Sequence, residues 1–125
     1  MALKTLDAQR AETMEALCEL IVPGSSRVGP VVYVDAILTN MPPFVRDDTL
    51  AAIDKLAPFA AAGAEALAEH ELTPEFAMVR ALAIEAYYSD FVAPGLDVDG
   101  AWKEIDFNSP LATRLEKDWS YLGVA

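Results

Sequence analysis

The sequence predicts an all-α protein, an irregular or orthogonal bundle of about five helices with a partly extended, aromatic C-terminal arm. Hydrophobic residues make up 54% of the 125 residues, enough to form a buried core. In several segments apolar residues recur three and four positions apart, and prolines and glycines separate these segments. The length suits one domain over residues 1–125, with the bundle in 1–105 and the arm in 106–125.

The first predicted helix begins after Asp7 and ends before Pro23. Asp7 suits the N-cap position because its carboxylate can accept hydrogen bonds from the free amides of the first turn. The helix has an apolar stripe on one face, formed by Ala11, Met14, Leu17, Cys18 and Ile21. The glutamates of this segment fall on the opposite face, which we expect to be solvated. Pro23 cannot continue the helix, and Gly24 suits a left-handed turn after it.

The next segment fits two secondary structures. Its valine-rich stretch, residues 31–34, has strand propensity. However, Pro30 suits the first position of a helix. A helical period also relates the apolar residues of the segment, Val31, Val34, Leu38 and Met41. No other segment offers a convincing strand to pair with. We therefore predict a helix that ends near Asn40 and is broken by Pro42.

Residues 44–57 continue the helical pattern, and we expect Pro58 to mark a joint after them. The apolar face of this helix consists of Leu50, Ile53, Leu56 and Ala57. An alanine-rich helix is predicted next, in residues 59–71. Gly63 is its weak point, because glycine destabilises the interior of a helix.

The fifth predicted helix starts at Thr73, a capping residue followed by a proline at the first helical position. Its sequence is apolar nearly all round, so we expect it to be buried on most sides, in the middle of the domain. We expect it to end at Pro94 and the glycine that follows. Beyond a loop, residues 101–105 suit a single helical turn and residues 109–116 a short helix.

The charge of the chain excludes several classes of partner. The formal net charge is -11 and the isoelectric point about 4.3. A negative field repels phosphate backbones and anionic lipid, so we expect no nucleic-acid binding. No apolar run reaches about 18 residues, so we expect no membrane insertion. Neither a signal peptide nor a twin-arginine leader precedes the first helix, and we expect a cytoplasmic protein.

No self-sufficient catalytic set is recognisable in the sequence. Cys18 lies on the apolar face of the first helix and is expected to be inert packing. His70 is expected to be an exposed residue at a helix end, and no second histidine could complete a zinc site. The six glycines form no dinucleotide- or phosphate-binding motif. We predict no catalytic, metal-binding or cofactor-binding residue in this chain; a small enzyme acting through Asp or Glu is a minor alternative.

Residues 14–43, MEALCELIVPGSSRVGPVVYVDAILTNMPP, combine an amphipathic helix ending in Ile-x-Pro-Gly, a short polar loop and a second helix with Tyr-Val-Asp. This order resembles the opening of the gluconate 2-dehydrogenase subunit 3 family. The residues that carry the resemblance are Leu17, Leu20, Ile21, Pro23, Gly24, Tyr33, Val34 and Asp35. Two later segments, residues 83–95 and 107–123, resemble the aromatic C-terminal half of that family. The match spans most of the chain, through short motifs.

The resemblance implies an accessory role. Proteins of that family are small, non-catalytic subunits of flavin dehydrogenases. The large subunit, of the glucose-methanol-choline oxidoreductase type, holds FAD and oxidises a sugar, a sugar acid or a related alcohol or glycoside. The small subunit supports folding of its partner and often brings a twin-arginine export leader. This sequence shows no such leader, which favours a cytoplasmic complex.

Aromatic residues gather in the least regular part of the chain, where its own core has least use for them. Aromatic side chains are the anchors expected in a protein–protein interface. The predicted partner-binding residues are Tyr87, Tyr88, Trp102, Phe107, Trp119, Tyr121 and Leu122. The competing interpretation is that they fold back and close one end of the bundle. The alternative function is a free-standing helical module that binds another protein or an apolar small molecule.

Overall fold

The computed structural model describes residues 2–107 and 120–123, and every regular element in these two ranges is a helix. The all-α prediction is therefore confirmed. The elements, in chain order, are α1 (Ala8–Ile21), the 3-10 turn η1 (Ser25–Val28), α2 (Pro30–Asn40), α3 (Pro43–Ala62), α4 (Ala64–Ala68), α5 (Pro74–Tyr88), α6 (Ala101–Glu104) and the 3-10 turn η3 (Ser120–Leu122).

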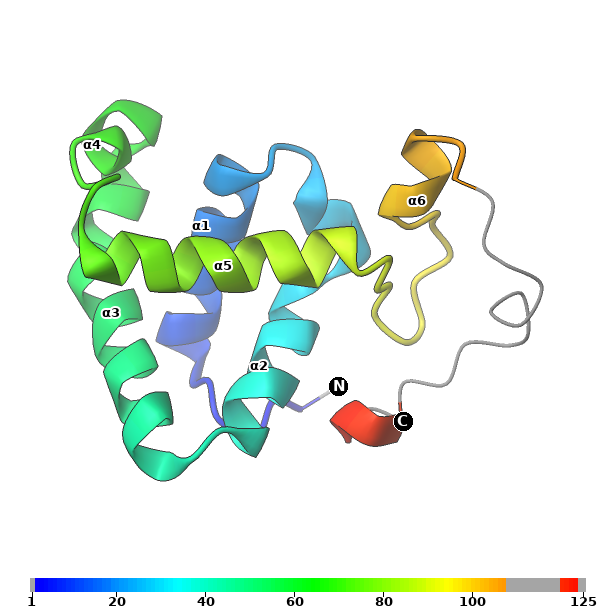
Figure 1. Cartoon of the computed structure of the whole chain (residues 1–125), viewed down its shortest axis with the longest axis horizontal. Helices are drawn as coiled ribbons and strands as arrows, with labels where there is room; N and C mark the ends of the chain where they lie inside the picture. The colour runs from blue at the N-terminus through cyan, green and yellow to red at the C-terminus, as the bar shows by residue number, and fades with distance from the viewer. Residues whose placement is uncertain (1, 108–119, 124–125) are drawn as a thin grey trace.

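The core lies where α5 crosses the first three helices. Figure 1 shows α5 passing in front of α1 and α2, with α3 along one side. α5 contacts all three of these helices, as its predicted central place requires. The largest fully buried side chains come from several parts of the chain and include Met14, Leu17, Leu38, Ile53 and Phe91. Burial of apolar surface between crossing helices is thus the main force that holds the bundle together.

The predictions for α1 and α2 are confirmed. The Asp7 carboxylate accepts a hydrogen bond from the backbone amide of Arg10 at 2.8 Å, and α1 ends at Ile21. Pro30 occupies the start of α2, which ends at Asn40. The valine-rich stretch is helical because its period of three and four brings Val34 and later apolar residues onto one buried face.

The predicted joint at Pro58 is wrong. α3 continues through Pro58 to Ala62. Pro58 lacks the amide that would bond the carbonyl of Asp54, but both residues are exposed, so water can satisfy that carbonyl. The break comes at Gly63, whose φ of 114° lies in a region that other residues rarely adopt. The alanine-rich helix is correspondingly short and forms α4.

α5 starts as predicted but ends earlier. The Thr73 hydroxyl accepts a hydrogen bond from the Phe76 amide at 3.2 Å. The helix stops at Tyr88, six residues before the expected end at Pro94, because Asp90 adopts a left-handed conformation with φ of 65°. Phe91, just beyond, still reaches the core and packs edge-on against Tyr33, with ring centroids 5.2 Å apart.

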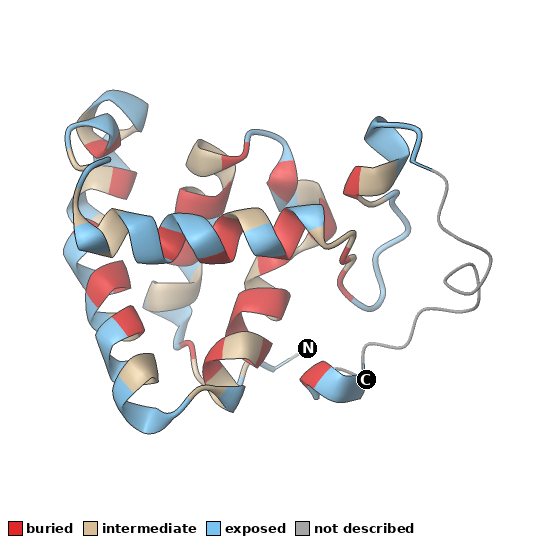
Figure 2. Cartoon of the chain, in the orientation of Figure 1, coloured by how far each residue is buried: buried red, intermediate tan, exposed pale blue. Residues whose placement is uncertain are grey.

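One face of α5 is exposed, so the expectation that this helix is buried on most sides is wrong. Figure 2 shows exposed residues alternating with buried ones along α5. The exposed residues include Ala77, Met78, Ala81, Glu85 and Tyr88. Apolar residues on this face return below as parts of candidate surfaces.

The last described segments are short. α6 is the single turn predicted for residues 101–105. The helix predicted for residues 109–116 lies outside the described residues, as does Trp119. None of the helices in residues 2–107 and 120–123 combines the length and the apolar character needed to cross a bilayer.

Candidate interaction surface

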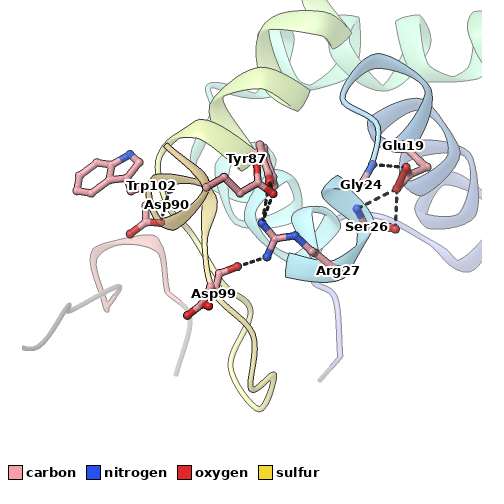
Figure 3. Close-up of polar contacts among 9 residues, drawn as sticks. Glu19, Gly24, Ser26, Arg27, Tyr87, Asp90, Asp99 and Trp102 are labelled. Carbon is pink, nitrogen blue, oxygen red and sulfur yellow. Dashed lines mark hydrogen bonds and ion pairs between the residues drawn. The ribbon is translucent and has the colours of Figure 1, made fainter. Parts of the chain in front are cut away.

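α6 is seated on the end of α5 by polar contacts. The Asp90 carboxylate accepts a hydrogen bond from the backbone amide of Trp102 at 3.0 Å. The indole Nε1 of Trp102 donates to the backbone carbonyl of Tyr88, also at 3.0 Å. Gly100 makes this approach possible, because a Cβ there would lie 2.1 Å from Asp90 Oδ1. The left-handed turn at Asp90 therefore fixes where Trp102 lies (Figure 3).

Aromatic and aliphatic side chains are exposed around this junction. Tyr88 is 54% exposed, Phe107 48% and Ile105 68%. The rings of Trp102 and Phe107 meet edge to face, with centroids 5.1 Å apart. We call Tyr88, Trp102, Ile105 and Phe107 the aromatic surface. The Trp102 indole is held by its hydrogen bond, and the rings of Tyr88 and Phe107 each pack edge to face on a neighbouring ring. Side chains held in this way lose less freedom on binding.

Arg27 links η1 to α5 and α6 and so supports the elements that carry the aromatic surface. It lies in η1, and its guanidinium donates to the Tyr87 hydroxyl at 2.8 Å, to Glu104 Oε1 at 2.6 Å and to the backbone carbonyl of Asp99. The Tyr87 hydroxyl also donates to Glu104 Oε1, at 2.5 Å. These contacts, drawn in part in Figure 3, join η1, α5 and α6. We call Arg27, Tyr87 and Glu104 the Arg27 network.

The Arg27 network favours one charge state. The hydrogen bond from Tyr87, together with the one from Arg27, lowers the pKa of the Glu104 carboxyl below its ordinary value. Burial, assisted by the bond to Glu104, raises the pKa of the Tyr87 hydroxyl. Glu104 is therefore ionised and Tyr87 neutral at pH 7. With its donors and acceptors satisfied by one another, the network suits positioning of α6 better than a reaction.

Glu19 holds the loop that carries Arg27, a role the sequence did not reveal. Its carboxylate accepts from the backbone amides of Gly24 and Ser26, at 2.5 and 3.2 Å, and from the Ser26 hydroxyl at 2.7 Å (Figure 3). The bond from Gly24 is the largest cause that lowers the pKa of Glu19. We expected the glutamates of α1 to be merely solvated. The sequence did contain a signal for this role, namely a glutamate in the last turn of a helix before a Gly-Ser-Ser loop.

The predicted partner-binding residues do not all come together. Tyr87 is buried within the Arg27 network, and Leu122 is buried in the main core. Tyr121 is exposed, but it lies in η3. That turn contacts α2 and lies at a distance from α6 (Figure 1). Among the predicted residues that the structure describes, Tyr88, Trp102 and Phe107 share one surface.

Asp35 is a second polar residue whose role was missed. It is buried, and its carboxylate accepts from the backbone amides of Lys4, Thr5 and Leu6 at 2.8, 2.9 and 2.8 Å. The N-terminal segment is thereby fixed to α2, on which Leu122 also packs. An aspartate inside the apolar run VVYVDAIL needs such partners, because a buried charge without hydrogen bonds is costly.

Cys18 is buried, as its place in the apolar stripe predicted. Burial, with the nearby charges of Glu15 and Glu19, raises the pKa of the Cys18 thiol to about 12, which opposes thiolate chemistry. His70 is half-buried instead of exposed, because its ring stacks on Phe59 with centroids 3.7 Å apart. Within the described ranges, no three His, Cys, Asp or Glu side chains gather in a way that could hold a metal ion.

Comparisons of this chain with protein-family models, curated proteins and solved structures find no match. The resemblance to the gluconate 2-dehydrogenase subunit 3 family therefore stays a prediction.

Proposed function

We propose that this chain is a non-catalytic accessory subunit that docks on a larger protein through the aromatic surface. The observation that carries the proposal is the exposure of Tyr88, Ile105 and Phe107. These side chains are carried by a frame of Asp90, Gly100, α6 and the Arg27 network, which hydrogen bonds hold together. Exposed apolar side chains that cluster on a surface indicate an interaction site. Aromatic anchors that are ordered in advance lose little entropy on binding.

The proposed partner is a large FAD-binding oxidoreductase of the glucose-methanol-choline type. This part of the proposal rests on the family resemblance of residues 14–43, 83–95 and 107–123. In the complex, FAD and the oxidation of a sugar, sugar acid or glycoside belong to the large subunit. The present chain supports folding and stability of that subunit and contributes no catalytic or cofactor-binding residue.

Co-expression tests the proposal. A candidate large flavoprotein of the proposed type is produced with and without this chain, and soluble yield, FAD content and dehydrogenase activity are measured. We expect all three to fall without the small chain. Equal FAD content and activity in both preparations would contradict the accessory role.

A double variant, Tyr88→Ala with Phe107→Ala, tests the surface itself. Loss of central aromatic anchors commonly costs about 2 kcal/mol or more, on the order of 30-fold in affinity. Phe44→Ala is the matched control, since Phe44 is 71% exposed but lies at the start of α3. We expect the double variant to lose the flavoprotein in a pull-down and the control to retain it. Equal retention would place the interface elsewhere.

The alternative is a free-standing module that binds another protein or an apolar small molecule. One observation favours its protein-binding form, an open apolar hollow of about 500 Å³ beside α5. This alternative predicts a stable chain that captures no flavoprotein, so the same pull-down separates the two functions.

A further inference from the structure

A hollow lies between α5 and the segment that runs from Met41 into α3. Its volume is about 500 Å³. The lining of this α3–α5 hollow includes Met41, Val45, Thr49, Met78, Ala81 and Glu85. Ala81, Met78 and Glu85 are exposed, so the hollow is open to solvent along the outer face of α5.

The floor of the α3–α5 hollow is apolar. Its one hydroxyl, from buried Thr49, already donates to the backbone carbonyl of Val45 at 2.8 Å. Met41 and Met78 both line the hollow, and methionine side chains adapt to varied apolar surfaces. An occupant must therefore present apolar side chains to the floor and find its polar contacts at the rim.

The rim is acidic. A second hollow shares Met78 and adds Asp48, Lys55 and Glu75 to the lining. Among the described residues that line the two hollows, three carboxylates thus accompany one ammonium, because Glu85 belongs to the first. That ammonium, on Lys55, is paired with Glu75 at 2.8 Å. Arg46, whose guanidinium donates to the Met41 carbonyl at 3.1 Å, adds a second positive charge nearby.

We infer that the α3–α5 hollow binds an amphipathic helix of a partner protein, whose apolar ridge is flanked by lysine or arginine. Apolar side chains at helical spacing fit the floor, and cationic flanks complement Asp48 and Glu85. A second copy of this chain is disfavoured because each copy carries a charge of -11. A small apolar molecule is disfavoured because such ligands are usually enclosed, whereas this hollow is open.

The inference is independent of the proposed flavoprotein, and a peptide tests it on the full chain. The probe is a fluorescein-labelled peptide of about 14 residues, roughly 21 Å long as a helix, with leucines along one face and lysines beside them. One control peptide has the same composition in an order without an apolar face. Another replaces lysine with glutamate. Binding is followed by fluorescence anisotropy at 50 and 300 mM salt.

Ala81→Arg is the decisive variant, because it fills the hollow and adds a positive charge. Ala77→Arg is its matched control, on the same exposed face of α5 but outside the lining. Circular dichroism verifies that both fold. We expect the lysine-flanked peptide to bind at least tenfold more weakly to Ala81→Arg and unchanged to Ala77→Arg. Its affinity should also fall at the higher salt concentration.

Several results would overturn the inference. One is that the lysine-flanked peptide does not bind. Another is that the glutamate-flanked peptide, or the control peptide without an apolar face, binds as tightly as the lysine-flanked peptide. Equal effects of Ala81→Arg and Ala77→Arg would place the peptide elsewhere. Displacement of the peptide by oleate at equal concentration would identify an apolar small molecule as the occupant. A dimer in light scattering that Ala81→Arg dissolves would identify a second copy.

Discussion

In α1 the buried side chains Met14, Leu17 and Cys18 come from one face of a regular helix. In residues 99–107, by contrast, the position of the chain depends mainly on polar side chains from separate elements: Asp90 after α5, Arg27 in η1 and Glu104 in α6. The first region is stabilised by many apolar contacts. The second depends on a few hydrogen bonds, each of modest net value. The bundle should therefore resist change better than the frame of the aromatic surface.

The largest loss of stability should follow from a cavity in the bundle. Leu17→Ala removes a side chain with no exposed area, at a cost of about 2–5 kcal/mol in the free energy of unfolding. Leu72→Ala, on a side chain that is almost fully exposed, should change it by less than about 0.5 kcal/mol. Urea denaturation followed by circular dichroism measures both. Similar values for the two variants would contradict the buried place of Leu17.

Gly100→Ala should have a smaller effect, confined to the frame of the aromatic surface. The new Cβ would meet Asp90 Oδ1 at 2.1 Å, and forcing it in should cost about 1–3 kcal/mol. In a Trp119→Phe background, Trp102 is the only remaining tryptophan, and its emission should shift to the red as the indole gains water.

The double variant Gly100→Ala with Asp90→Gly separates steric conflict from other causes. Glycine suits the left-handed conformation at position 90 and removes the carboxylate that the new Cβ would meet. The costs of the two single changes should therefore not add. Additive costs would mean that Gly100 acts in some way other than by leaving room for Asp90.

Arg27→Ala should cost about 1 kcal/mol, because the side chain is partly exposed and its ion pair with Glu104 is screened by water. Its local effect should be larger than its global one. Backbone amides of residues 99–107 should exchange with deuterium faster, while those of α1 keep their rates. Arg80→Ala, on an exposed arginine of α5, is the matched control and should alter neither region.

The sequence predicted the bundle well because apolar period and capping residues are local signals. Asp7, Pro30 and Thr73 each mark a helix start that the structure bears out. The ends were harder. Pro58 lies on an exposed side of α3, where the helix tolerates it. α5 ends because Asp90 adopts a left-handed conformation, and an aspartate in the sequence does not by itself predict that conformation.

The frame of the aromatic surface could not be predicted, because its contacts join residues far apart in the chain. Arg27 meets Glu104 across 77 positions, and no periodic pattern encodes such a pair. The sequence singled out Tyr88, Trp102 and Phe107 by residue type alone. It could not separate them from Tyr87 and Leu122, which are buried.

The smallest predicted effect is a pH dependence of the Arg27 network. The bonds from Tyr87 and Arg27 lower the pKa of Glu104, so the folded chain binds this proton less readily than the unfolded chain. The stabilisation is therefore complete above the ordinary pKa of about 4.5 and is lost as pH falls through the lower folded value. Glu104→Gln lacks this titration.

Thermal melting of the wild type and of Glu104→Gln between pH 7 and pH 3 measures this contribution. The wild type should melt at the higher temperature at pH 7, and the difference should shrink below about pH 4.5. Glu12→Gln, at an exposed position of α1 on the opposite side from the apolar stripe, is the control for loss of one negative charge. A difference that stays constant with pH would show that Glu104 acts by shape instead of charge. In that case, the frame of the aromatic surface would depend on packing, as the bundle does.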